Sequence, residues 1–189
     1  MADLKITFTL SDRDVAHLRR VMRHATTAVR AQNEPDIVAK AGELATSVRE
    51  AKPPKYVLER VEKLETIVEM AGDKSWNLPA NIRRKVIGAL GYFANPTDLI
   101  PDQVPGLGFL DDAIMIELVA QDLRHEMKAY REFCSFRDSA EQRPWTRVGH
   151  DALDERLVAK RRRLREKVKE RNQADRERAQ QGRGLRRLW

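Results

Sequence analysis

Apolar residues recur at intervals of three and four along most of this chain, which is the spacing of one face of an α-helix. The clearest stripes lie within residues 15–29, 37–48, 57–68, 82–93, 114–123 and 153–168. Polar and charged residues fill most of the positions between them. This pattern predicts a mainly α-helical bundle, in which each stripe is buried against neighbouring helices.

The ends of the stripes carry helix start and stop signals. Ser11 suits an N-cap, and Asp14 three residues later makes a weak form of the capping box. Pro35 and Pro79 suit the first turns of a second and a fourth helix, and Gly72 suits the end of the third. Two further helices are expected, one from near residue 111 towards residue 133 and one from about residue 151.

One short segment departs from the helical period. Leu4, Ile6, Phe8 and Leu10 alternate with polar residues, which is the pattern of a β-strand with one buried face. A single strand is not stable alone, so it must pair with another chain or lie on the helices. The predicted fold is therefore helical with one short N-terminal strand.

Charge is distributed unevenly along the 189 residues. Residues 1–153 hold 22 Lys and Arg against 23 Asp and Glu, whereas residues 154–189 hold 14 against 6. The net charge of +7 thus belongs to an extended basic C-terminal helix. Its densest part suits phosphate groups, through charge-assisted and bidentate contacts. The candidate polyanion-binding residues are Lys160, Arg161, Arg162, Arg163, Arg165 and Lys167.

The compartment is inferred from cysteine content and hydropathy. One cysteine, Cys134, excludes an internal disulfide framework and fits a reducing environment. The N-terminus has no apolar run of secretory length, and the longest uncharged stretch, residues 86–97, is shorter than the ~20 residues of a membrane-spanning helix. We therefore expect a cytoplasmic protein without a transmembrane span, for which peripheral contact with a membrane stays open.

Residues 95–112, NPTDLIPDQVPGLGFLDD, differ from the rest of the chain. They contain three prolines, two glycines and four aspartates, and no Lys or Arg occurs from residue 86 to residue 123. Pro96 cannot continue a preceding helix, and Gly108 permits positive φ or close backbone approach. Asp98 suits a cap, and Asp111 and Asp112 suit a helix start, where the macrodipole favours negative charge.

This segment resembles the signature of the YkvA-like family (domain of unknown function 1232). The resemblance covers about residues 80–120 and implies a helical hairpin closed by the loop, membrane association in other members and no established activity. The residues that carry it are Tyr92, Asn95, Pro96, Asp98, Leu99, Ile100, Pro101, Asp102, Pro105, Leu107, Gly108, Asp111 and Asp112. We expect these residues to form a structural signature loop.

Catalytic chemistry has little support in the sequence. No phosphate-binding glycine loop, nucleophile elbow or Cys-x-x-Cys pair occurs, so no catalytic residue and no cofactor is predicted. Asp98, Asp102, Asp111 and Asp112 are oxygen donors of the kind that Mg²⁺ and Ca²⁺ prefer, although their spacing is not that of an EF-hand. Capping explains these aspartates without a metal, and a metal or a basic partner stays the alternative.

Together these observations predict three segments along the chain: an N-terminal strand and helical extension at 1–74, a YkvA-like hairpin domain at 75–140, and a linker with a basic arm at 141–189. The expected function is a non-enzymatic interaction module whose arm contacts a polyanion, either nucleic acid or ribonucleoprotein. One alternative is a peripheral membrane protein that binds anionic lipid. Another is a metal-dependent hydrolase that uses the loop aspartates.

Overall fold

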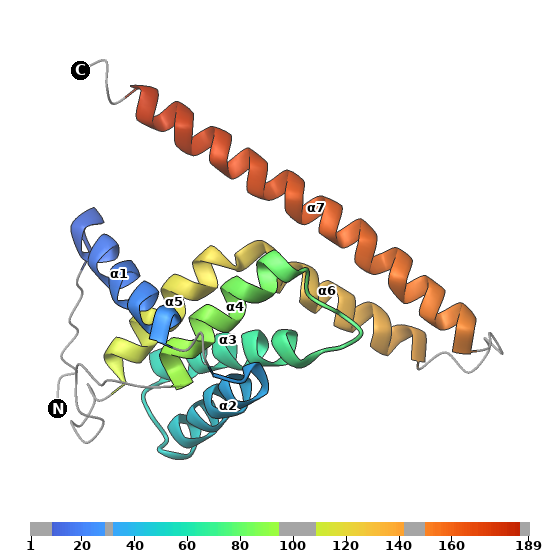
Figure 1. Ribbon diagram of the computed structural model, residues 1–189, viewed down its shortest axis with the longest axis horizontal. Helices are drawn as coiled ribbons and strands as arrows, with labels where there is room; N and C mark the ends of the chain where they lie inside the picture. Colours follow the sequence, from blue (N-terminus) through green and yellow to red (C-terminus); the bar gives the residue numbers. More distant parts are fainter. Residues whose placement is uncertain (1–8, 29–31, 95–108, 142–149, 186–189) are drawn as a thin grey trace. The chain divides into compact units, whose positions relative to one another are not determined.

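The computed structural model describes residues 9–28, 32–94, 109–141 and 150–185, which are almost entirely helical (Figure 1). The helices of these residues are α1 (Asp12–Ala28), α2 (Glu34–Glu50), α3 (Lys55–Gly72), α4 (Ala80–Ala94), α5 (Leu110–Asp122), α6 (Arg124–Glu141) and α7 (His150–Leu185). The mainly helical prediction is confirmed. The predicted strand falls largely on residues 1–8, outside the described residues, and Thr9 and Leu10 are not in a strand.

The predicted N-cap of α1 is confirmed at atomic detail. The Ser11 backbone N–H donates to Asp14 Oδ2 at 2.8 Å, and the Asp14 backbone N–H donates to Ser11 Oγ at 3.3 Å. Ser11 Oγ also donates to Asp14 Oδ2 at 2.7 Å. These reciprocal bonds satisfy donors that the first helical turn leaves without partners.

The helices divide into two compact units. Unit 1 comprises residues 1–72 and 79–118, and unit 2 comprises residues 73–78 and 119–189. The segment 73–78, which joins α3 to α4 along the chain, thus packs with α6 and α7. The two units are defined by which residues pack together, whereas the three predicted segments are continuous stretches of sequence. The two divisions of the chain therefore have different boundaries.

In unit 1, helices α1, α2 and α3 all pack against α4 (Figure 1). Every residue of α4 from Val86 to Ala94 is buried, as expected for a helix that other helices cover on several sides. The predicted stripes of α2 and α3 face inwards, with Ile37, Ala41, Val57 and Val61 all at most 2% exposed. The absence of Lys and Arg after residue 86 is therefore explained, for α4, by complete burial.

Side chains at the surface of unit 1 join helices that are distant in sequence. Arg49 on α2 donates to both carboxylate oxygens of Glu65 on α3, at 2.9 and 2.7 Å. Lys63 Nζ on α3 donates to Glu117 Oε2 at 2.6 Å, and Arg60 Nε lies 3.2 Å from the same oxygen. Pairs as exposed as Arg49 and Glu65 contribute ~1 kcal/mol or less, so the apolar core dominates the stability of unit 1.

The single helix expected from residue 111 towards 133 is in fact two helices, separated at Leu123. The Arg124 guanidinium donates to the Gln121 carbonyl oxygen at 2.8 Å, and so satisfies one acceptor at the end of α5. Apolar periodicity does not reveal this break, because Leu123 stays buried and so continues the stripe.

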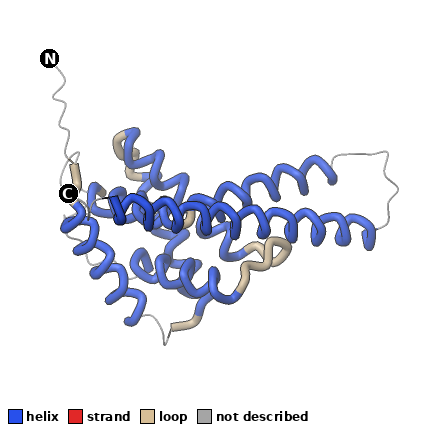
Figure 2. Tube along the Cα trace, turned by 90° about the horizontal axis from the view of Figure 1, so that it is seen from above, coloured by secondary structure: helices blue, strands red, loops and turns tan. Residues whose placement is uncertain are grey.

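Unit 2 is built on the side-by-side packing of α6 and α7 (Figures 1 and 2). Leu157, Leu164 and Val168 of α7 are buried, as predicted. Trp76 from the segment 73–78 is completely buried, and its ring lies 5.8 Å from the ring of Tyr130 and 5.2 Å from that of Phe133 on α6. The aromatic cluster therefore joins this short segment to α6.

Asp73 organises the backbone of that segment. Its Oδ1 accepts the backbone N–H groups of Ser75 at 2.8 Å and Trp76 at 3.0 Å, and its Oδ2 accepts Arg137 of α6 at 2.8 Å. Asn77 has a φ of 48°, a left-handed conformation that asparagine tolerates better than most residues. These features place the Trp76 side chain against α6.

Trp76→Ala should lower the free energy of unfolding of unit 2 by about 3–5 kcal/mol, because it leaves a cavity among α6 side chains. Chemical denaturation followed by far-ultraviolet circular dichroism would measure the change. Val158→Ala is the matched control. Because Val158 is 50% exposed, this substitution should change the free energy of unfolding by no more than about 0.5 kcal/mol. Equal stability of the Trp76→Ala protein and the wild type would contradict this view of unit 2.

Asp73 should make unit 2 sensitive to acid. Burial by itself raises the pKa of Asp73, but the hydrogen bonds from the Trp76 backbone N–H and the Arg137 guanidinium outweigh it and lower the pKa. The stability that Asp73 contributes is thus present above its unfolded pKa of about 3.9 and is lost as the pH falls through its lower folded pKa.

Asp73→Asn should therefore destabilise the protein at neutral pH and reduce the further loss of stability below about pH 4. Thermal unfolding from neutral to acid pH would test this. Asp138→Asn, which changes an exposed carboxylate on α6 next to Arg137 in the sequence, serves as the control. A wild type and an Asp73→Asn variant with parallel profiles at low pH would exclude this role for Asp73.

Candidate functional site

Most residues of the predicted signature loop lie outside the described residues: Asn95, Pro96, Asp98, Leu99, Ile100, Pro101, Asp102, Pro105, Leu107 and Gly108. Three signature residues are placed. Tyr92 is buried on α4, with its ring 5.1 Å from that of Phe93 in an edge-to-face arrangement. Asp111 and Asp112 lie in the first turn of α5.

Asp111 and Asp112 are both buried, at 9% and 7% exposure, and each has interaction partners. Their position at the N-terminus of α5 favours negative charge. Within the described parts of the chain, no three His, Cys, Asp or Glu side chains gather closely enough to hold a metal ion. The metal site predicted from four aspartates includes Asp98 and Asp102, which are outside those parts.

Two of the six predicted polyanion-binding residues point into unit 2. Arg161 donates to the Ser75 carbonyl oxygen at 2.6 Å. Arg165 donates to the Trp76 carbonyl oxygen at 2.8 Å and to that of Asn77, and its guanidinium lies 5.8 Å from the Trp76 ring centre. Burial and the nearby Arg161 lower the pKa of Arg165. Both arginines thus join α7 to the segment 73–78 through its backbone carbonyl groups.

Lys160 and Lys167 lie on another side of α7 and meet Glu132 of α6. Lys160 Nζ donates to Glu132 Oε1 at 2.7 Å, and Lys167 Nζ lies 3.9 Å from the same oxygen. Lys160 Nζ also lies 5.4 Å from the ring centre of Phe136, and the Arg156 guanidinium lies 5.8 Å from it. These cations remain accessible, because the Lys160 and Lys167 side chains are 23% and 40% exposed.

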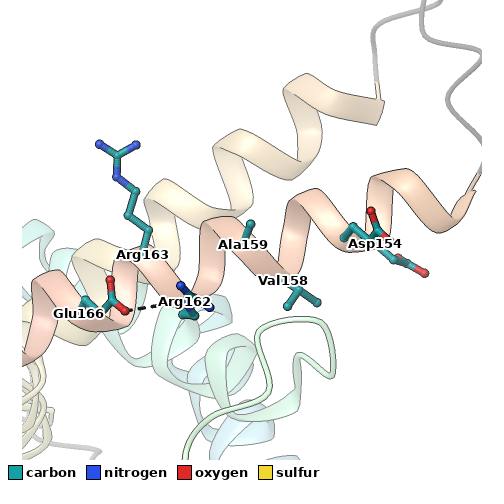
Figure 3. A pocket seen from close by; sticks show the side chains of 7 residues that line it. Asp154, Val158, Ala159, Arg162, Arg163 and Glu166 are labelled. Carbon is teal, nitrogen blue, oxygen red and sulfur yellow. Dashed lines mark ion pairs between the residues drawn. The ribbon is translucent and has the colours of Figure 1, made fainter.

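Arg162 and Arg163 are exposed. Arg162 Nε lies 3.8 Å from Glu166 Oε1 on the outer side of α7, where both side chains are largely in solvent. Figure 3 shows Arg163 and Val158 on opposite sides of the helix. The hollow drawn there, of about 550 Å³, is lined by Asp154, Glu155, Val158, Ala159, Arg162, Arg163 and Glu166. All seven residues come from one helix, so this is an open surface and not an enclosed catalytic cavity.

Helical geometry separates the mixed charges of α7 by face. Successive residues of an α-helix are rotated by about 100°, so residues spaced by three, four or seven lie on the same side. Six cations of α7 have this spacing, and we name the side on which they lie the cationic flank. Its members are Arg156, Lys160, Arg163, Lys167, Arg171 and Arg178. Glu155, Glu166 and Glu177 lie on the outer face, and Glu170 lies at the border between the two. Asp175 lies next to the flank, with its Oδ1 4.0 Å from Arg178 Nη1. Position 174 is the flank's one gap, and it is alanine.

Arg156, Arg171 and Arg178 lie outside the densest run of basic residues and were not among the residues predicted from the sequence. Spacing by three and four residues, which identified the apolar stripe, groups them with Lys160, Arg163 and Lys167. The sequence also gave no sign of the partner of His125, whose Nε2 lies 2.6 Å from Asp175 Oδ2 on α7. Arg124 pairs with the same oxygen, so this contact joins α6 to α7.

No helix among the described residues has the length and apolar character needed to cross a membrane.

Comparison with known proteins finds similarity in the middle of the chain. A family model described as "Protein of unknown function (DUF1232)" matches residues 83–118, which include most of α4 and part of α5. The uncharacterized membrane protein YkvA of Bacillus subtilis (strain 168) is 38% identical over 45 residues, 24% of this chain and 42% of that protein. The match therefore spans less than half of that relative's length, and no solved structure matches. Residues 83–118 of the chain are therefore similar to the YkvA-like DUF1232 family.

Proposed function

We propose that this protein is a non-enzymatic helical interaction module that binds the phosphate backbone of a nucleic acid through the cationic flank of α7. The observation that carries the proposal is the alignment of six cations on one side of a helix whose acidic residues lie mostly elsewhere. From residue 156 to residue 178 the flank extends about 33 Å at 1.5 Å per residue. That length spans several phosphates of a duplex.

The chemistry of the flank favours backbone contact over base recognition. Phe136 is the aromatic side chain beside the flank cations, and its ring already lies next to Arg156 and Lys160. Lysine and arginine bind phosphate irrespective of sequence, and sequence specificity requires contacts to base edges. Binding should therefore be sensitive to salt and show little sequence preference. A cytoplasmic location, where nucleic acid is available, is part of this proposal.

We propose no catalytic role for Cys134. Cys134 is the chain's single cysteine, and burial raises the pKa of its thiol, which disfavours the reactive thiolate.

Neutralising the flank should weaken binding more than neutralising the same number of cations elsewhere on α7. The test variant is R163Q/K167Q/R171Q, and the matched control is R162Q/K169Q/R176Q, which removes three cations from other sides of the helix. Each phosphate contact contributes about 0.9 to the salt slope on duplex DNA, so the test variant should lose about 2–3 units of slope and at least tenfold in affinity.

Fluorescence anisotropy with a labelled DNA duplex, between about 50 and 200 mM salt, would measure both quantities. Substitution is preferable to deletion of residues 154–189, because deletion would remove Leu157, Leu164 and Val168 from the core of unit 2. Equal weakening by the two variants would mean that net charge and not the flank determines binding. Salt-independent binding by the wild type would exclude the mechanism.

A second candidate function is contact with an anionic membrane surface. Two observations favour it: the relative from Bacillus subtilis is named a membrane protein, and α1 is a cationic amphipathic helix. Val15, Leu18 and Met22 of α1 are half-buried on one side. Exposed arginines lie on the others: Arg13, Arg20 and Arg23. Because α1 packs against α4, its exposed arginines are the part that can meet anionic headgroups.

If α1 binds lipid, R13Q/R20Q/R23Q should reduce flotation with phosphatidylglycerol vesicles at low salt and leave duplex binding by α7 unchanged. Each cation near an anionic surface contributes about 1 kcal/mol, so vesicle binding should fall by roughly two orders of magnitude. Vesicles of phosphatidylcholine alone serve as the uncharged control. Retained flotation of the variant would assign lipid contact to another surface, and absence of flotation by the wild type would exclude this function.

A further inference from the structure

Glu132 lies in the middle of the cationic flank although it belongs to α6. Its Oε1 is 2.7 Å from Lys160 Nζ and 3.9 Å from Lys167 Nζ. The hydrogen bond from Lys160 and the charges of Lys160, Lys167 and Arg171 together lower the pKa of Glu132, so the carboxylate is ionised at neutral pH. One carboxylate oxygen thus marks the point at which several flank cations converge.

The charges at this point are not balanced. One carboxylate faces Lys160, Lys167 and Arg171, which leaves an excess of about two positive charges around it. The comparable cluster in unit 1 is nearer to balance: Arg60 contacts both Glu59 and Glu117, Lys63 pairs with Glu117 and Lys55 with Glu59, so three cations meet two carboxylates. Glu132 is also partly open to solvent, with its side chain 39% exposed. An external anion can therefore approach the same cations.

A phosphodiester is well suited to replace the carboxylate. Both are singly charged oxyanions that accept hydrogen bonds from ammonium and guanidinium groups, and Arg171 can offer bidentate geometry to phosphate. Phe136 lies beside the ammonium of Lys160, and so helps to hold it at this point when Glu132 moves aside.

We infer that Glu132 occupies the position of one backbone phosphate and competes with nucleic acid for Lys160, Lys167 and Arg171. This inference rests on the proposed function of α7 and adds a defined phosphate subsite with an internal competitor. Removing the competing charge should strengthen binding, whereas a purely structural ion pair would give no such gain.

The test compares Glu132→Gln with Glu166→Gln, which makes the same change of charge on the outer face of α7. With a labelled DNA duplex at about 100 mM salt, E132Q should bind about three- to tenfold tighter than the wild type. E166Q should stay within about twofold of it, because Glu166 lies off the flank. The salt slope of E132Q should rise by about 0.9, the value for one additional phosphate.

A double-mutant comparison distinguishes competition from a general effect of charge. Lys160→Gln should weaken binding little in the wild type, where Glu132 neutralises Lys160, and several-fold in the E132Q background. Thermal unfolding of each variant verifies that unit 2 is folded, and E132D, which keeps the charge, should bind like the wild type.

Unchanged or weaker duplex binding by E132Q, with the wild type still binding through the flank, would overturn this inference alone. Absence of binding by the wild type and by both single variants would overturn the proposed function together with it. An increase seen with phosphatidylglycerol vesicles but not with the duplex would assign the subsite to lipid phosphate and overturn the nucleic-acid assignment.

Discussion

The burial of Trp76 is the constraint on which unit 2 depends. The completely buried indole holds the segment 73–78 against Tyr130 and Phe133 of α6. The backbone carbonyl groups of Ser75, Trp76 and Asn77 then accept hydrogen bonds from α7, Arg161 donating to Ser75 and Arg165 to Trp76 and Asn77. The aromatic core and the contacts of α7 are therefore consequences of one feature.

This constraint also decides which cations of α7 face outwards. Leu164 and Val168 point into the core, and Arg161 and Arg165 point towards the segment 73–78. Together they set the rotation of the helix about its axis. With that rotation set, the cationic flank, which includes Arg163, lies on another side. Two of the six residues predicted for phosphate binding, Arg161 and Arg165, are thus used in packing.

Glu132 links the folding of unit 2 to its proposed activity. Its ion pair with Lys160 joins α6 to α7, yet these half-exposed charges contribute little to stability in water. In the proposed function, this carboxylate competes with an incoming phosphate, because it occupies the place where Lys160 and Lys167 meet. A weak structural contact can in this way regulate a surface without controlling the fold.

Much of the fold could be predicted from the sequence, for a local physical reason. Apolar periodicity indicates buried faces wherever a helix forms, so the inward positions of α2, α3 and α7 were found correctly. The capping box of Ser11 and Asp14 depends on residues three apart, and it was found too. The break at Leu123 was not found, because a buried leucine continues the stripe while the backbone ends one helix and begins another.

By itself, the sequence determined the helices, their apolar stripes and the total charge of the C-terminal segment, since these follow from nearest neighbours and composition. Only the tertiary structure decided which of the six predicted arm residues contact the rest of unit 2. Arg161 and Arg165 donate to backbone carbonyl groups some 90 residues away in sequence, whereas Arg163 is exposed. It also placed Glu132 among the flank cations. Such pairings depend on how α7 packs and rotates against α6 and the segment 73–78, and no local pattern encodes that rotation.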